Sequence, residues 1–301
     1  MAAKADSLRT VLYALGANFA IGVAKLAAAI ATGSSAMLAE AIHSFADCGN
    51  QALLLLGMKL AQRPPSPSYP LGHGRAIYFW SFIVALVLFS LGGVFSIYEG
   101  AHKLASPAPL SYPWVAVGVL LFGIAAETVS LRACLAEIAK VRGGRSLWRW
   151  FRDSRQSELV VILGEDIAAE VGLALALLAV LATLLTGDPI YDAFGSIAIG
   201  AVLVVVAILI AIEIQGLLIG QSAEPETEAA IRLFIERREE VAQVLRVITL
   251  QLGGSVMVAV KANMRDTDAA AMVASINRVE AAVREAFPEI QWLFFEPDVA
   301  D

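Results

Sequence analysis

The sequence predicts an α-helical polytopic membrane protein, with a six-helix transmembrane bundle followed by a small α+β domain. Of the 301 residues, 58% are hydrophobic and only 17% are charged, whereas soluble domains average about a quarter charged residues. Apolar segments of about 20 residues, long enough to cross the hydrocarbon core of a bilayer, recur along the first two thirds of the chain. After Gly220 the composition becomes that of a soluble domain. We therefore expect a transmembrane domain over residues 1–220 and a tail domain over residues 221–301.

Turn-forming residues separate the apolar segments. Thr32-Gly33-Ser34-Ser35 ends the first segment, four prolines between Pro64 and Pro70 end the second, and Gly187-Asp188-Pro189 ends the fifth. The predicted spans lie near Leu12–Ile30, Met37–Leu60, Ile77–Glu99, Trp114–Arg132, Leu159–Leu185 and Asp192–Ile219.

The placement of basic residues predicts the orientation. Three lie between spans two and three and six lie between spans four and five, whereas the opposite loops hold only His102 and Lys103. Basic loops stay in the cytoplasm, so we expect both termini there, in a multi-pass protein of a bacterial inner or plasma membrane. The net charge of −6 argues against nucleic acid as a partner.

The tail predicts the element order αββαβ, typical of a ferredoxin-like helix-on-sheet layer. Gly253-Gly254 between two apolar runs is a hairpin signal. The predicted elements are a helix over Glu226–Glu240, strands over Val244–Leu252 and Val256–Ala262, a helix over Ala269–Phe287, and a strand over Ile290–Phe295.

Two ionisable side chains lie in the second span. His43 and Asp47 are four residues apart, so an imidazole and a carboxylate share one face of the helix. Inserting an Asp at the centre of a membrane helix costs about 2.5–3.5 kcal/mol. Ionisable side chains in spans therefore usually face the bundle interior, where they serve an ion or proton path. We expect this pair to bind or move a cation.

The fifth span holds three carboxylates, Glu165, Asp166 and Glu170. Asp166 and Glu170 share a face, and Glu165 lies about 100° away. A bound divalent cation or shared protons relieve the repulsion among such groups, although a neutral hydrogen-bonded network between helices is the alternative. One imidazole with carboxylates suits Zn²⁺, and also Mn²⁺, Fe²⁺ or Co²⁺. Because these ligands must release protons to bind a metal, proton exchange is a natural coupling.

Other polar residues of the spans have two readings each. Asn50, one turn beyond Asp47, donates to a ligand or simply packs. Lys25 pairs with a carboxylate or extends toward the interface. Glu127 makes a hydrogen bond within the bundle or relays protons.

Two motifs resemble the cation diffusion facilitator family: the run Thr32-Gly33-Ser34-Ser35-Ala36-Met37-Leu38-Ala39-Glu40-Ala41-Ile42-His43-Ser44-Phe45-Ala46-Asp47, and the loop Tyr69-Pro70-Leu71-Gly72-His73-Gly74-Arg75. The resemblance covers essentially the whole chain. It implies a homodimer that exports a divalent metal, commonly zinc, from the cytoplasm in exchange for protons by alternating access.

The resemblance also assigns site residues. His43 and Asp47 match the family's first ligand pair, whereas Ile162 stands where the family usually has a histidine in span five. The branch resembled carries Glu-Asp there and includes a mitochondrial zinc transporter, so Glu165, Asp166 and Glu170 are the expected remaining metal ligands. His73 matches a residue that binds a peripheral ion in some relatives. No histidine follows His102, so we expect the tail to dimerise and not to sense zinc.

The expected function is therefore proton-coupled efflux of a divalent cation, with the metal as substrate and no cofactor. We expect no enzymatic activity. Two alternatives stay open from the sequence: a non-transporting regulatory or scaffold paralogue, motivated by the missing histidine, and a membrane-embedded metal-dependent enzyme, which lacks a recognisable nucleophile or substrate motif.

Overall fold

A computed structural model describes residues 18–107, 109–266 and 268–300 of the chain. The chain divides into two compact units, each described by itself below. The first contains the described residues up to Leu56, together with Trp80–Gly144 and Glu158–Glu213. The second contains Gly57–Phe79, Arg145–Ser157 and the segment from Ile214 onward. A domain boundary at residue 220 stays a prediction.

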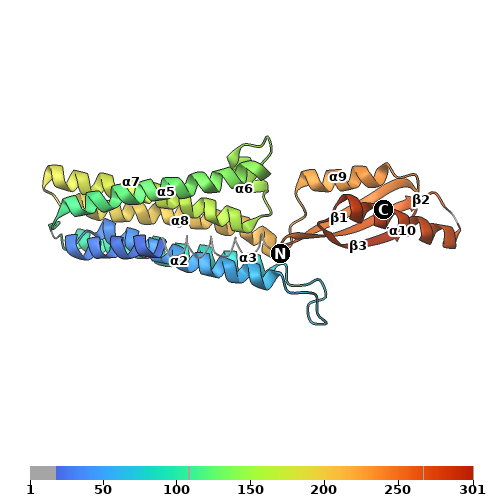
Figure 1. Cartoon of the computed structure of the whole chain (residues 1–301), viewed down its shortest axis with the longest axis horizontal. Coiled ribbons are helices and arrows are strands. Elements are labelled where there is room, and N and C mark those ends of the chain that lie inside the picture. The colour runs from blue at the N-terminus through green and yellow to red at the C-terminus, as the bar shows by residue number, and fades with distance from the viewer. Residues whose placement is uncertain (1–17, 108, 267, 301) are drawn as a thin grey trace. The chain divides into compact units, whose positions relative to one another are not determined.

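Long helices form the bundle, and Figure 1 shows α2, α5, α7 and α8 running lengthwise in it. Within the described part of the chain, four helical segments are long and apolar enough to span a membrane, and they match predicted spans three to six. The bundle elements are the helix Asn18–Thr32, α2 (Ser35–Ala61), α3 (Ala76–Val87), the π-helix η1 (Leu88–Val94), α4 (Phe95–Ala105), α5 (Pro113–Val141), α7 (Ser157–Thr186) and α8 (Ile190–Ile219).

The first two predicted spans differ from the others in the structure. The described part of span one is the shorter apolar helix Asn18–Thr32, and the predicted residues before it lie outside the described residues. Helix α2 has 27 residues, about 40 Å of helix, so its length suffices to cross a bilayer. Its ionisable side chains make α2 less apolar than the four long helical segments that match spans three to six.

The third span is one continuous helical segment, Ala76–Ala105, which is longer than predicted and contains η1 in its middle. Glycines bring this segment close to α8. A Cβ on Gly93 would lie 2.6 Å from Val204 Cγ2, and one on Gly200 would lie 2.6 Å from Gly93 O. Small residues of this kind allow close backbone approach between membrane helices.

One end of the bundle is joined by a buried polar cluster around Asp192 of α8. Lys103 of α4 donates from Nζ to Asp192 Oδ2 at 2.8 Å and to Gly33 O at 2.6 Å. The Ser35 amide, at the start of α2, donates to Asp192 Oδ2 at 2.7 Å, and Ser34 Oγ donates to Asp192 Oδ1. Asp192 is fully buried, so it caps α2 while Lys103 balances its charge.

The tail has the predicted order αββαβ, formed by α9 (Pro225–Glu236), β1 (Val241–Leu252), β2 (Ser255–Met264), α10 (Ala269–Ala286) and β3 (Ile290–Pro297). The sheet order is β1-β2-β3, with β1 antiparallel and β3 parallel to β2. The turn between β1 and β2 places Gly253 at φ +67°, which favours glycine and confirms the predicted hairpin. The second unit also contains α6 (Leu147–Asp153).

Both tail helices pack against one face of the sheet. Ile231 and Ile235 of α9 and Val279 and Val283 of α10 are buried with the even-numbered residues of β2 from Val256 to Met264. The prediction that the first tail helix extends to Glu240 was wrong, because α9 ends at Glu236 and Val241 already begins β1.

Glu240 instead lies in the segment between α9 and β1, where it makes ion pairs with Arg238 of the same segment and with Arg278 of α10. Its Oε1 accepts from Arg238 at 3.3 Å and from Arg278 at 3.2 Å. Burial raises the pKa of Glu240, but hydrogen bonds from its backbone, from Arg278 and from Arg238 outweigh that effect and hold the pKa below its usual range.

Candidate functional site

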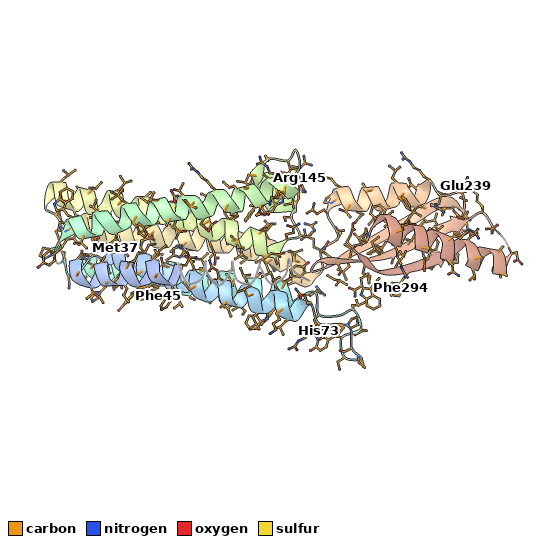
Figure 2. The ribbon with its side chains drawn as sticks, in the orientation of Figure 1. Met37, Phe45, His73, Arg145, Glu239 and Phe294 are labelled. Atoms are coloured by element: carbon orange, nitrogen blue, oxygen red, sulfur yellow. The ribbon has the colours of Figure 1, made fainter. Side chains whose placement is uncertain are left out.

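His43 and Asp47 lie one turn apart on α2, as their spacing predicts. His43 Nδ1 is 3.5 Å from Asp47 Oδ1, and the two side chains are 1% and 14% exposed. Among the described residues, neither ring nitrogen of His43 has a hydrogen-bond partner, and Asp47 Oδ1 also lacks one. Buried polar atoms are normally satisfied, so this pair has unused capacity to bind a ligand. Figure 2 labels Met37 and Phe45 on the same helix.

Glu165 of α7 is the fifth-span carboxylate that contacts α2. Its Oε1 accepts a hydrogen bond from Asn50 Nδ2 at 2.5 Å, and Asn50 follows Asp47 by three residues. Glu165 is only 6% exposed. The structure therefore brings His43, Asp47, Asn50 and Glu165 to one α2–α7 contact. Of the two readings of Asn50, hydrogen bonding to a candidate ligand is the one observed.

Asp166 and Glu170 share a face of α7, as predicted, but that face contacts α5. Ser130 Oγ donates to Asp166 Oδ1 at 3.3 Å, and Thr128 Oγ1 donates to Glu170 Oε1 at 2.9 Å. Each acid keeps one buried oxygen without a partner. These two carboxylates therefore form a second acidic group, at the contact between α5 and α7.

Lys25 provides a positive charge inside the bundle. This fully buried lysine of the helix Asn18–Thr32 lies 3.3 Å from Glu40 Oε2 and donates to Ser44 Oγ at 2.9 Å. Of the two readings from the sequence, pairing with a carboxylate is the one observed. Glu40 was not singled out as a functional residue, although its i, i+3 spacing to His43 places both on neighbouring positions of one face.

No group of three His, Cys, Asp or Glu side chains able to hold a metal ion is assembled within residues 18–107, 109–266 and 268–300. The α2–α7 contact thus carries the donor types of a Zn²⁺ site without a closed cage of ligands. His73, in the loop before α3 and labelled in Figure 2, packs against Tyr69 with ring centroids 4.4 Å apart and ring planes inclined at 39°. Its Nδ1 is buried without a partner, and an ion-binding role for it stays a prediction.

Several curated proteins are similar to this chain. A protein of Xenopus laevis named "Proton-coupled zinc antiporter SLC30A9, mitochondrial" is 34% identical over 233 residues, which are 77% of this chain and 42% of that protein. The Homo sapiens protein of the same name is 32% identical over 232 residues, 76% of this chain and 41% of that protein. "Metal tolerance protein C4" of Arabidopsis thaliana is 31% identical over 231 residues, 76% of this chain and 50% of that protein.

This chain therefore spans half or less of the length of these relatives. The family model described as "Cation efflux transmembrane domain" matches residues 11–218, which is more than half of the chain and includes His43, Asp47 and Glu165. The resemblance to cation diffusion facilitators is confirmed. The chain belongs to the cation efflux family.

Proposed function

We propose that this protein is a proton-coupled antiporter that moves a divalent cation, in the first instance Zn²⁺, across a membrane by alternating access. The observation that carries the proposal is the α2–α7 contact, where the unpartnered nitrogens of His43 and the carboxylates of Asp47 and Glu165 converge in the bundle interior. Relatives of this chain are named as proton-coupled zinc antiporters. We place His43, Asp47 and Glu165 as metal ligands.

Asp166 and Glu170 have a separate place in the proposal. Because they accept hydrogen bonds from α5, we assign them to a neighbouring acidic group that enters the coordination only when α7 moves relative to α5. A proton on these carboxylates replaces the cation when the site is empty, because metal ligands exchange protons for metal. The incomplete ligand set fits a transporter, which must release its ion as readily as it binds it.

Metal flux into proteoliposomes tests the proposal. Asp47→Ala should abolish Zn²⁺ uptake driven by a pH gradient, whereas Asp188→Ala, at an exposed loop carboxylate, should leave it intact. Glu165→Gln should reduce flux more than Glu170→Gln, because Glu165 lies against Asn50. Flux that survives Asp47→Ala refutes the assignment of the site. Zinc binding by the wild-type chain without any flux favours the alternative of a regulatory or scaffold paralogue.

We further propose that both termini face the cytoplasm. The contacts of Lys103 with Gly33 and with Asp192 join three connections between spans: one–two, three–four and five–six. These three connections therefore lie at one end of the bundle. The strongly basic loops then belong to the opposite end, which the positive-inside rule assigns to the cytoplasm. Two of the similar proteins named above are mitochondrial, so a bacterial inner membrane stays a prediction.

The tail supports a proposed homodimer. Strand register aligns Ile248, Ala259 and Phe294 across the sheet, on the face opposite the helices. Ile248 and Phe294 are 52% and 54% exposed, so this face carries an apolar row. The next row contains Arg246, Lys261 and Glu296, which carry charges of both signs. In a two-fold dimer, the basic residues of one copy can pair with the acidic residue of the other copy.

Light scattering of the detergent-solubilised full chain tests the dimer. Phe294→Glu should give a monomer where the wild-type protein gives a dimer. Val273→Glu is the matched control, because Val273 is 58% exposed but lies on α10, and it should stay dimeric. A monomeric wild-type chain, or a Phe294→Glu variant that is still a dimer, contradicts the proposal.

A further inference from the structure

Lys25 lies in the middle of the helix Asn18–Thr32, and both side chains described as polar partners of its ammonium group, Glu40 and Ser44, belong to α2. Its ammonium group lies 3.3 Å from Glu40 Oε2 and 2.9 Å from Ser44 Oγ, and its side chain is 1% exposed. A lysine buried to this extent in the bundle is costly, and such residues usually serve an ion path. The effect of the Lys25 ammonium group on ion binding depends on where it lies relative to the metal ligands.

The ammonium group is close enough to the proposed ligands to act on them. Ser44, its hydrogen-bond partner, directly follows His43 in the sequence. The ammonium group lies 2.9 Å from Ser44 Oγ and 3.3 Å from Glu40 Oε2, so its positive charge lies beside the turn of α2 that carries His43. A divalent cation bound by His43 and Asp47 is then repelled by this charge.

The Lys25–Glu40 pair is also incompletely satisfied, which argues against a purely structural role. Glu40 is fully buried, and its Oε1 has no hydrogen-bond partner. That oxygen faces Gly172 of α7, where an added Cβ would lie only 2.5 Å away. A buried ion pair stabilises a fold only when its remaining hydrogen-bonding groups are satisfied, so this pair is poorly suited to that purpose.

We propose that Lys25 sets the affinity of the transport site: its positive charge weakens the binding of the divalent ion at His43, Asp47 and Glu165 and so permits its release. The proposal rests on the proposed function, in that it concerns the same site. A transported ion must be bound strongly enough to enter and weakly enough to leave. A tethered positive charge on the edge of an acidic site meets both demands, because it offsets part of the attraction of the carboxylates without blocking the ligands.

Titration calorimetry of the purified full-length chain with ZnCl₂ tests this proposal. Lys25→Met keeps the length of the side chain and removes its charge, so the dissociation constant for Zn²⁺ should fall at least about tenfold, because charges interact strongly in a poorly solvated interior. Lys25→Arg retains the charge and should bind within about threefold of wild type. Proton-driven efflux by Lys25→Met should slow, since release becomes harder.

A double variant keeps the test decisive if Lys25→Met does not fold. Lys25→Met with Glu40→Gln removes both members of the ion pair, and it should still bind Zn²⁺ more tightly than wild type, though by less than the single variant. An unchanged or weaker affinity in whichever variant folds overturns the proposal. If the wild-type chain binds Zn²⁺ but shows no proton-coupled flux, the proposed function is refuted instead. The ratio of the Zn²⁺ dissociation constants of variant and wild type still decides the role of Lys25.

Discussion

Replacing Lys103 by methionine should destabilise the bundle strongly. The substitution preserves most of the apolar stem but removes the ammonium group that contacts Asp192 Oδ2 at 2.8 Å and Gly33 O at 2.6 Å. Asp192 is fully buried, so its carboxylate would be left with only the neutral donors Ser34 and Ser35. The loss therefore affects the N-terminus of α2, the helix that carries the candidate site.

The magnitude follows from the burial of the pair. Removing one partner of a buried ion pair typically costs about 3–5 kcal/mol, because the other charge stays buried without compensation. Asp192→Asn in the Lys103→Met background should recover part of this loss, since the amide is neutral and its oxygen still accepts from the Ser35 amide. The double variant should thus be more stable than Lys103→Met alone.

Unfolding of the purified chain by SDS titration in mixed micelles measures these free energies. Lys140→Met is the matched control, because Lys140 lies 2.5 Å from Glu137 but the two side chains are 66% and 59% exposed. Exposed ion pairs contribute between about 0 and 1 kcal/mol, so this variant should unfold like the wild type. A Lys103→Met variant no less stable than Lys140→Met would refute the reasoning that Asp192 needs Lys103 to compensate its buried charge.

Three further predictions concern the site and the tail. Asn50→Ala should weaken Zn²⁺ binding about 10–100-fold in calorimetry, because Glu165 loses the donor that orients it; an unchanged affinity would remove Glu165 from the ligand set. Gly172→Ala should cost about 1–3 kcal/mol in the SDS titration, since its Cβ would press on the buried carboxylate of Glu40. The pKa of Glu240 is lowered by folding, so its stabilising effect is present above the ordinary carboxyl pKa of about 4.3 and is lost as the pH falls through the lower folded value. Glu240→Gln should therefore reduce the protection of tail amides from hydrogen exchange at neutral pH but change it little in strong acid.

Much of the architecture could be predicted because it depends on local patterns. Apolar runs, prolines and Gly187 locate the four long spans, and Gly253 locates the hairpin, since each is a property of a few neighbouring residues. The end of α9 could not be located in this way. Residues 237–240 continue the polar pattern of the helix, and the start of β1 at Val241 depends on pairing with Met264, a distant residue.

The candidate site was predictable in composition but not in arrangement. The spacing of His43 and Asp47 was sufficient to place them on one face of α2, and the spacing of Asp166 and Glu170 to place them on one face of α7. Which face of α7 meets α2 depends on the rotation of the helix, and the contact of Gly172 with Glu40 fixes that rotation. Glu165 and Gly172 are seven residues apart, nearly two full turns, so they point the same way.

The π-helical turn Leu88–Val94 has a consequence for sequence alignment and for insertions or deletions. A π turn accommodates an additional residue, so every side chain beyond it is rotated by about 100° relative to a regular α-helix. Deleting one residue between 88 and 94 would restore regular bonding without shortening the span appreciably. Lys103 would keep its direction toward Asp192, because the residues beyond the turn would stay where they are now. A relative that lacks this extra residue should align with a one-residue gap in this turn and carry its cation in the same place.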